Sequence, residues 1–244
     1  MRVISFFTAK GGTGKSTFNM LLASFLQYEQ GKRVIVLDFD APEYNLTVTR
    51  RREMDAARRA GREIDEATLY PIESIEVLSI EELRQLAGNL AGLAERFDYL
   101  IMDFKGSFLK TDAVFQMVVE KCLDLVVVPV ELDGMSIASC YSLGNIFHQL
   151  DQRMLVFFNR VVGRENPKMY EQFADFFAKG GIPLSDCRIK NTVKMRRDSD
   201  AVTGFVRSSI CFPDKEIRAV NPEIVKLFNE VLDYVGKEEE TAAG

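Results

Sequence analysis

The sequence has few of the residues on which many enzyme classes depend. It contains no tryptophan, four cysteines and one histidine, His148, among 244 residues. One histidine excludes histidine-rich metal sites, and a catalytic triad would need His148, which falls in an expected helix without a nucleophile motif. The cysteines are widely spaced without a C-x-x-C pair, so we expect buried thiols and neither a disulfide framework nor a zinc ribbon. They are Cys122, Cys140, Cys187 and Cys211.

The sequence also has no long apolar run, and we expect no signal peptide. The apolar runs are strand-sized and broken by charges, and Met1–Thr8 has no signal-peptide pattern. We therefore expect a soluble, cytoplasmic protein with a single domain over residues 1–244, ending in an acidic disordered tail at about 237–244. The net charge of −5 argues against a protein that coats nucleic acid with its whole surface, but it is compatible with a local basic patch.

Short apolar runs alternate with segments of helical periodicity. Near-continuous apolar strands are typical of a parallel sheet covered on both faces, and their alternation with helices implies right-handed crossovers. The pattern predicts a doubly wound α/β fold, with a mostly parallel sheet flanked by helices. The expected strands are Val3–Phe7, Val34–Leu37, Tyr99–Met102, Leu123–Val130 and Met154–Phe158. The expected helices are Lys15–Gln30, Ile80–Glu95, Asp112–Lys121, Met135–Leu150, Lys168–Lys179 and Pro222–Val235.

A glycine-rich segment joins the first expected strand to the first expected helix. Its glycines leave backbone N–H groups free to surround phosphate oxygens, and the helix N-terminus adds partial positive charge. Lys15 is expected to neutralise the β- and γ-phosphates, and Ser16 to offer a hydroxyl to Mg²⁺. The segment therefore predicts a phosphate-binding loop. It comprises Ala9, Lys10, Gly11, Gly12, Thr13, Gly14, Lys15, Ser16 and Thr17.

Carboxylates follow two further strands. In doubly wound sheets, ligands bind beyond the carboxyl ends of the strands, where the strand order reverses. Carboxylates at strand ends are costly unless a cation compensates them. Asp38 and Asp103 are therefore candidates for a metal shell. Asp40 is a candidate for positioning a water molecule that attacks the bound phosphate. The alternative for Asp38 and Asp40 is a pair of helix-capping aspartates.

The phosphate loop departs from the ordinary motif in one respect. Ala9 replaces the first glycine, and a second lysine, Lys10, stands before Gly11. This Lys-Gly-Gly-x-Gly-Lys-Ser pattern resembles the ParA/MinD family of deviant Walker A P-loop ATPases, in which two monomers sandwich two nucleotides. The resemblance implies that Lys10 reaches the phosphates held by a partner subunit. The alternative is a solvated loop lysine.

Other segments extend this resemblance. Asp38-Phe39-Asp40 with Asn45 is similar to the first switch of the family, and the strand ending at Asp103 is similar to its Walker B strand. The following Phe104-Lys105-Gly106-Ser107 departs from the Thr-Pro-Pro usual in relatives, which leaves the hydrolysis rate open. Asn159 resembles the family residue that recognises adenine, and an amide can both donate to and accept from that base, favouring ATP over GTP.

The resemblance implies an ATPase that requires ATP and Mg²⁺ and releases ADP and phosphate. It would alternate between a monomer and an ATP-sandwich homodimer, respond to a stimulating or adaptor protein, and position DNA or a macromolecular complex, as in plasmid partition or conjugative-element maintenance. The alternatives are a non-hydrolysing nucleotide-dependent scaffold and an ATP-dependent ligase like dethiobiotin synthetase, which Lys10 disfavours. A nitrogenase-type reductase is a further alternative, but this chain lacks the suitably placed cysteines that such a reductase needs to hold its cluster.

Two basic clusters are candidate partner surfaces. The first alternates with acidic residues at helical spacing, which is typical of a solvated face. The second lies in a region that contributes to nonspecific DNA binding in ParA-like relatives, so DNA is a candidate partner. The acidic segment Asn221–Val235 argues against a membrane anchor. The first cluster is Arg50, Arg51, Arg52, Arg58, Arg59 and Arg62, and the second is Arg188, Lys190, Lys194, Arg196, Arg197 and Arg207.

Overall fold

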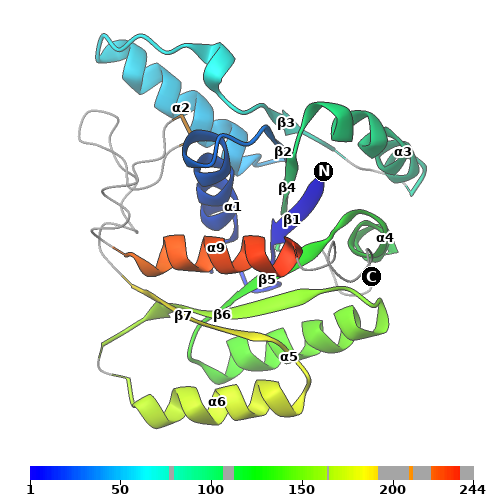
Figure 1. Ribbon diagram of the computed structural model, residues 1–244, viewed down its shortest axis with the longest axis vertical. Coiled ribbons are helices and arrows are strands. Elements are labelled where there is room, and N and C mark those ends of the chain that lie inside the picture. Colours follow the sequence, from blue (N-terminus) through cyan, green and yellow to red (C-terminus); the bar gives the residue numbers. More distant parts are fainter. Residues whose placement is uncertain (77–79, 107–112, 164, 192–208, 211–220, 237–244) are drawn as a thin grey trace.

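The computed structural model describes residues 1–76, 80–106, 113–163, 165–191, 209–210 and 221–236 (Figure 1). The strands form one seven-stranded sheet in the order β3-β2-β4-β1-β5-β6-β7, and every neighbouring pair is parallel. The expected doubly wound α/β class is confirmed. The strands are β1 (Arg2–Phe6), β2 (Val34–Phe39), β3 (Ile72–Ser74), β4 (Tyr99–Phe104), β5 (Leu125–Val130), β6 (Met154–Val161) and β7 (Leu184–Lys190).

Helices connect successive strands. α1 continues into a π-helical segment, Phe25–Glu29, and Gly31 follows in the left-handed region at φ 62°, where glycine is favoured. A short 3₁₀ helix, Glu66–Thr68, precedes β3. The α-helices are α1 (Lys15–Ser24), α2 (Asn45–Arg59), α3 (Ile80–Arg96), α4 (Ala113–Cys122), α5 (Gly134–Gln149), α6 (Pro167–Lys179) and α9 (Glu223–Gly236).

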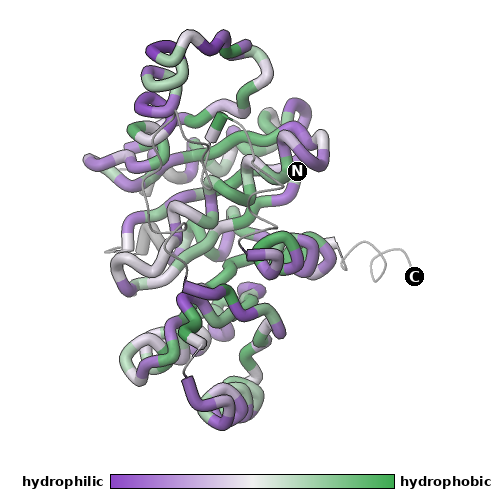
Figure 2. The backbone as a smooth tube through the Cα atoms, turned by 90° about the vertical axis from the view of Figure 1, so that its left-hand side faces the viewer, coloured by the Kyte–Doolittle hydropathy of each residue, from purple (hydrophilic) through white to green (hydrophobic). Residues whose placement is uncertain are grey.

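The sheet separates two hydrophobic cores. Side chains alternate along each strand, so Phe6 and Val36 pack toward α1 and α9, while Phe7 and Leu37 pack on the opposite face. Helices α3, α4, α5 and α6 cover that second face. Figure 2 shows the resulting hydrophobic centre with hydrophilic residues on the outer helices and turns. Both faces of the central strands are therefore buried.

The five expected strands and six expected helices are confirmed, with shifted boundaries, whereas α2, β3 and β7 were not expected. Helix α2 is rich in arginine and buries only Leu46, Glu53 and Ala57, so it has little apolar periodicity. Strand β3 has three residues. Strand β7 is an edge strand that alternates buried and exposed residues, and it lacks the continuous apolar run of the central strands.

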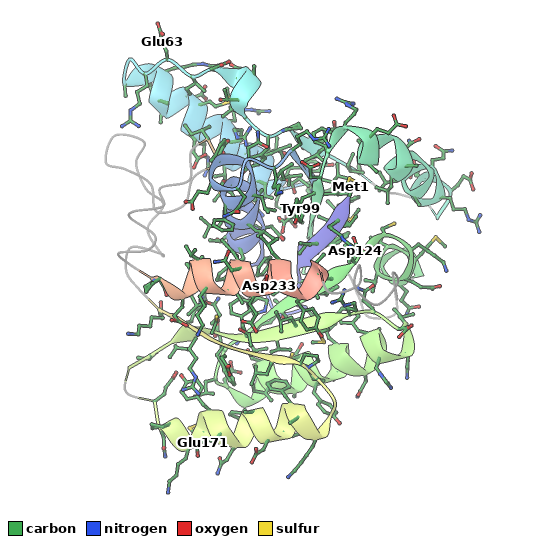
Figure 3. The ribbon with its side chains drawn as sticks, viewed as in Figure 1. Met1, Glu63, Tyr99, Asp124, Glu171 and Asp233 are labelled. Carbon is green, nitrogen blue, oxygen red and sulfur yellow. The ribbon has the colours of Figure 1, made fainter. Side chains whose placement is uncertain are left out.

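The N-terminal ends of the strands lie on the side of the sheet opposite to their carboxyl ends. Figure 3 shows Met1, Tyr99 and Asp124 close together at the beginning of three central strands. Asp124 Oδ2 accepts a hydrogen bond from the Val3 backbone N at 2.6 Å, which ties the start of β1 to β5. This contact helps to hold β1 and β5 in register at their N-terminal ends. In sheets of this kind, ligands bind at the carboxyl ends of the strands.

The cysteines and the histidine, which are scarce in the sequence, lie in different environments. Cys122, Cys140 and Cys187 are buried free thiols as expected, and Cys211 lies outside the described residues. Burial raises the pKa of the Cys140 thiol to about 12, so this thiol is unreactive at neutral pH. His148 is exposed on α5. Within the described ranges, no helix combines the length and the apolar character that crossing a membrane requires. The proposed tail at 237–244 lies outside these ranges.

Candidate functional site

Three predicted site residues face the same layer of helices. Asp38 and Asp103 are opposite each other in the register of β2 and β4, and Asn159 lies near the end of β6. Along its strand, each lies two residues after a preceding member of the same alternation of side chains. That preceding member packs in the core with α1, so the site residue points to the same face of the sheet. The sheet thus directs all three polar side chains toward the helix that begins at the phosphate loop. Those preceding members are Val36, Ile101 and Phe157.

The phosphate loop has the backbone that the sequence predicts. Gly12 and Gly14 have φ values of 73° and 96°, a left-handed conformation that other residues rarely adopt. A Cβ atom placed on Gly11 or Gly12 would have no neighbour within 4 Å, so the space beside them is open. Helix α1 begins at Lys15, directly after Gly14. The loop therefore offers an open, electropositive helix N-terminus for a phosphate group.

Asp103 is completely buried beside this loop. Asn19 Nδ2 donates to its Oδ1 at 2.7 Å, whereas no described residue forms a hydrogen bond with its Oδ2. Burial raises the pKa of Asp103 to about 7, while nearby Ser16, Asn19 and Lys15 lower the pKa in part. A buried carboxylate with one unpaired oxygen is costly unless a cation approaches it. The interaction of Ser16 with Asp103 also shows that these two predicted metal-shell residues lie close together.

The chain that follows β4 passes against the phosphate-loop lysine. A Cβ atom on Gly106 would lie 3.1 Å from Lys15 Nζ and 3.6 Å from the carbonyl oxygens of Thr8 and Ala9. That distance is tighter than most side chains tolerate, so the position suits glycine. The Lys15 ammonium thus lies close to the end of β4.

In this structure Asp38 caps helix α2. Its Oδ2 accepts hydrogen bonds from the backbone N–H groups of Leu46 and Thr47, both at 3.1 Å, and from Thr47 Oγ1 at 3.2 Å. Burial raises the pKa of Asp38, and these hydrogen bonds oppose that rise. The helix-capping alternative therefore describes the observed contacts of Asp38, and its membership of a metal shell stays a prediction.

Asp40 lies in the loop between β2 and α2. Its Oδ2 accepts a hydrogen bond from Asn45 Nδ2 at 2.5 Å, and its carbonyl oxygen accepts one from the Tyr44 backbone N at 2.7 Å. The five-residue spacing from Asp40 to Asn45 therefore closes a compact loop. Asp40 is half-buried, and its role in positioning water stays a prediction.

Lys10 is bound within its own chain. Its Nζ donates to Asp133 Oδ2 at 3.0 Å, to Ser136 Oγ at 2.9 Å and to Glu131 Oε2 at 3.3 Å. The hydrogen bond to Asp133, with a further contribution from Glu131, raises the pKa of Lys10 although burial opposes this. Glu131 also accepts a hydrogen bond from Arg160 Nη1 at 2.9 Å. Lys10 is therefore not a solvated loop lysine, and its action on a partner stays a prediction.

Asn159 connects β6 to the phosphate loop. Its Nδ2 donates to the Thr13 carbonyl oxygen at 2.7 Å, and its Oδ1 accepts from the Arg160 backbone N at 2.9 Å. Both ends of the amide thus have partners within the chain. The contact with Thr13 positions the loop, and recognition of adenine by Asn159 stays a prediction.

Sequence reasoning missed several residues of the site. Asn19 accepts from the Phe6 backbone N at 2.8 Å while donating to Asp103, so it joins α1 to two strands. The available signal was a polar residue within the buried part of a helix. The partners of Lys10 were missed as well, although Glu131 and Asp133 follow a buried strand, as the predicted site residues do. The third partner, Ser136, lies in the first turn of α5.

The first basic cluster is only partly a solvated face. Arg50 donates to Ser209 Oγ and to the Ser209 carbonyl oxygen, both at 2.8 Å, and stacks 4.5 Å from the Tyr70 ring centre. Buried Glu53 accepts from the Ser209 backbone N at 2.8 Å. The expectation is therefore wrong for Arg50, which joins α2 to a segment distant in sequence. The exposed members are Arg51, Arg52, Arg58, Arg59 and Arg62.

The second basic cluster is described only in part. Lys190 and Arg188 are exposed on β7, and the Arg188 guanidinium lies 4.4 Å from the ring centre of Tyr170. The other proposed DNA-contacting residues, Lys194, Arg196, Arg197 and Arg207, lie outside the described residues.

Known proteins resemble this chain in sequence and in fold. A family model described as an AAA domain matches residues 1–85, the part containing the phosphate loop and β2. A MinC:MinD cell division complex from Aquifex aeolicus matches with 17% identity and a TM-score of 0.65, covering 96% of each chain. The chain has the fold of MinD and ParA. Its predicted resemblance to the ParA/MinD family is thereby confirmed.

Two partition proteins share this MinD/ParA fold. A plasmid partition protein from Borrelia burgdorferi bound to AMPPNP has 16% identity and a TM-score of 0.62, covering 94% of this chain and 98% of the other. The pNOB8 ParA bound to nonspecific DNA has 18% identity and a TM-score of 0.62, covering 98% and 99%. A search of curated proteins found no match.

The residues present in this MinD/ParA fold suit a magnesium nucleotide. Open space lies beside Gly11 and Gly12, and the unpaired Asp103 oxygen is buried near Ser16 and Lys15. Among the described residues, no group of three or more His, Cys, Asp or Glu residues could hold a metal ion alone. Mg²⁺ takes one or two protein ligands and fills its shell with waters and substrate phosphates, so Ser16 and Asp103 would be enough protein ligands to hold it.

Proposed function

We propose that this protein is a Mg²⁺-dependent ATPase that alternates between a monomer and an ATP-sandwich dimer. The observation that carries the proposal is the fully buried Asp103, whose unpaired oxygen lies beside the phosphate loop. A cation-bound phosphate would compensate this carboxylate, and the adjacent Lys15 supplies a counter-charge for the phosphate itself. The fold shared with MinD and ParA supports the same conclusion.

Each residue of the site has a distinct task in this proposal. The backbone of Gly11–Gly14 surrounds phosphate oxygens, Lys15 binds the terminal phosphates, and Ser16 with Asp103 holds the metal shell. Mg²⁺ would neutralise charge on the phosphates and orient them. Asp40 positions the attacking water, because orientation is the main protein contribution to phosphoryl transfer.

The surroundings of Lys10 support a second copy as the partner. Its ion pairs with Asp133 and Glu131 are partly exposed, and exposed pairs are weak enough to exchange. Met135, next to the Ser136 that binds Lys10, is 82% exposed, which is the greatest exposure of a large apolar side chain among the described residues. In the ATP-bound dimer, Lys10 leaves these partners and binds the phosphates held by the other subunit.

The cargo we propose is DNA or a macromolecular complex, positioned or segregated in the cell with an adaptor or stimulating protein. Solved structures with this fold include a ParA bound to nonspecific DNA and a MinD in complex with MinC. Exposed Arg188 and Lys190 on edge strand β7 supply part of a cationic surface for the DNA backbone.

A lysine substitution at the phosphate loop tests the proposal. Lys15→Ala should weaken ATP binding about a hundredfold or more, about 2.8 kcal/mol, because it removes the principal phosphate counter-charge. Isothermal titration with ATP and Mg²⁺ measures this effect. Lys121→Ala, an exposed lysine at the end of α4, is the matched control and should bind as wild type does. Unchanged affinity in Lys15→Ala would refute the site.

The unusual residues after β4 keep one alternative function open to test. Lys105 and Gly106 replace the family pattern at the second switch, and a protein altered there could bind ATP without hydrolysing it. Phosphate release by wild type, with and without candidate partners, separates the two functions. Sustained turnover supports the ATPase, and tight binding without turnover supports a nucleotide-dependent scaffold.

A further inference from the structure

Lys105 joins the ends of two neighbouring strands. It is the first residue after β4, and its Nζ donates to the Ala41 carbonyl oxygen at 3.2 Å and to Glu43 Oε2 at 3.0 Å. Phe39 and Phe104 are opposite each other in the parallel register, so the chain segments after β2 and β4 leave the sheet side by side. The lysine therefore spans the gap between these two segments.

The segment that Lys105 holds contains Asp40. Two hydrogen bonds, from the Tyr44 backbone N and from the Asn45 side chain, close residues 40–45 into one loop around Asp40. A constraint on Ala41 and Glu43 is therefore also a constraint on Asp40. The loop leads directly into α2, which begins at Asn45.

On its other side, Lys105 is next to a residue that lies close to the phosphate loop. The next residue, Gly106, lies so close to Lys15 that an added Cβ atom would be 3.1 Å from the ammonium nitrogen. The backbone that carries Lys105 therefore passes beside the lysine expected to bind phosphate. Lys105 thus lies between the phosphate-binding side of the site and the Asp40 loop.

The charges suit a positional role. The hydrogen bond from Lys105 lowers the pKa of Glu43, so Glu43 is ionised at neutral pH. The two side chains are 36% and 53% exposed, and ion pairs at such exposure contribute little to the free energy of unfolding. Removal of the pair should therefore leave the fold intact, and any effect on activity would come from the geometry of the loop.

We propose that Lys105 is a positioning residue that holds the Asp40 loop at the nucleotide site and thereby sets the rate of ATP hydrolysis. This inference rests on the ATPase function proposed above. It assigns a role to the segment where the sequence departs from its relatives: an ion pair to the neighbouring loop holds the two switch segments together.

Three variants test this role. Lys105→Met and Glu43→Gln each break the ion pair with little change in side-chain length, and both should lower kcat several-fold, up to about tenfold, because an exposed ion pair favours one loop position by only about 1 kcal/mol. ATP affinity and KM should change less than about twofold, because the phosphate loop is intact. The double variant Lys105→Glu with Glu43→Lys restores the ion pair in reverse, without the hydrogen bond to the Ala41 carbonyl oxygen, and should recover part of the lost kcat.

Hydrogen exchange supplies a readout independent of turnover. The backbone amides of Tyr44 and Thr47 should exchange faster in Lys105→Met and return toward wild-type rates in the reversed pair. Lys121→Met is the matched control, because Lys121 is an exposed lysine in an ion pair at the opposite edge of the sheet, just before β5. It should match wild type in kcat, ATP affinity and exchange.

Two results would overturn the inference. Wild-type kcat and exchange in Lys105→Met would show that the pair positions nothing, and a large loss of ATP affinity would make Lys105 a phosphate ligand instead. If the wild-type protein shows no turnover, the ATPase proposal fails by itself. Exchange then decides about Lys105: faster exchange in Lys105→Met supports the positioning role, and unchanged exchange refutes it.

Discussion

The carboxyl group of Asp103 is stabilised on one oxygen only. Asn19 donates to Oδ1, and complete burial raises the pKa to about 7. Between the usual aspartate pKa and this value, the folded chain binds a proton at Asp103 that the unfolded chain does not bind. The contribution of Asp103 to stability is therefore present at acidic pH, below about 4, and is lost as pH rises through about 7.

This proton uptake predicts a pH-dependent stability. From pH 5 to pH 8, the free energy of unfolding of the wild-type protein without nucleotide should fall relative to that of Asp103→Asn by an amount on the order of 2 kcal/mol. The asparagine retains the shape without titrating. Urea denaturation of both proteins at the two pH values measures the difference. Parallel pH dependence in the two proteins would show that Asp103 titrates near its ordinary pKa.

At the scale of elements, helix α2 depends on contacts from outside itself. Its N-terminal N–H groups donate to Asp38 in β2, and its second and third turns hold Ser209 through Arg50 and Glu53. Because α2 buries few apolar side chains, these polar contacts fix much of its position. The same helix follows the Asp40 loop, so the nucleotide site and the Ser209 contact share one rigid element.

Loss of the cap should weaken this helix. Asp38→Ala removes the acceptor for the N–H groups of Leu46 and Thr47, whereas Asp38→Asn retains one acceptor oxygen and removes the charge. The alanine variant should therefore be less stable than the asparagine variant by about 1–2 kcal/mol, the usual loss for an N-cap. Chemical denaturation of both variants without nucleotide provides the measurement. Equal stabilities would contradict the capping role.

At the scale of the whole molecule, the candidate site lies at the carboxyl ends of the strands. Lys10 lies where the phosphate loop meets the end of β5, and its partners Glu131 and Asp133 keep it on its own chain. Exchange of these partners for a phosphate on another subunit would couple nucleotide binding to assembly. The two lysines of the loop, Lys10 and Lys15, then have separable effects.

That separation gives a prediction about assembly. Lys10→Ala should bind ATP as wild type does but fail to form the ATP dimer, because the apposed phosphates would lack the cross-subunit charge. Asp40→Ala should bind and dimerise but hydrolyse at least about tenfold more slowly, so its dimer accumulates. Light scattering with ATP and Mg²⁺, together with phosphate release, measures both properties. Normal dimerisation of Lys10→Ala with ATP would refute the proposed mechanism in which ATP switches the protein between monomer and dimer.

A second prediction at this scale concerns nucleic acid. Duplex DNA binding should require ATP and weaken steeply with salt, because it would depend on a few contacts to phosphates. Charge reversal by Arg196→Glu with Arg197→Glu should abolish binding at moderate salt, measured by fluorescence anisotropy. Glu substitutions at exposed Arg58 and Arg59 on α2 are the control and should leave binding intact. Binding that survives the first pair of substitutions would place the DNA surface elsewhere.

The sequence by itself determined the central strands, most helices and the phosphate loop, because these depend on local properties. Continuous apolar runs and helical periodicity follow from burial of nearby residues, and the glycines of the loop have their own backbone preferences. Tertiary structure alone decided the side-chain partners. Asn19 and Asp103 are 84 residues apart, Lys10 and Asp133 are 123 apart, and Arg50 and Ser209 are 159 apart. Such pairs meet because strand order and helix packing bring distant segments together, and periodicity along the chain carries no information about that order.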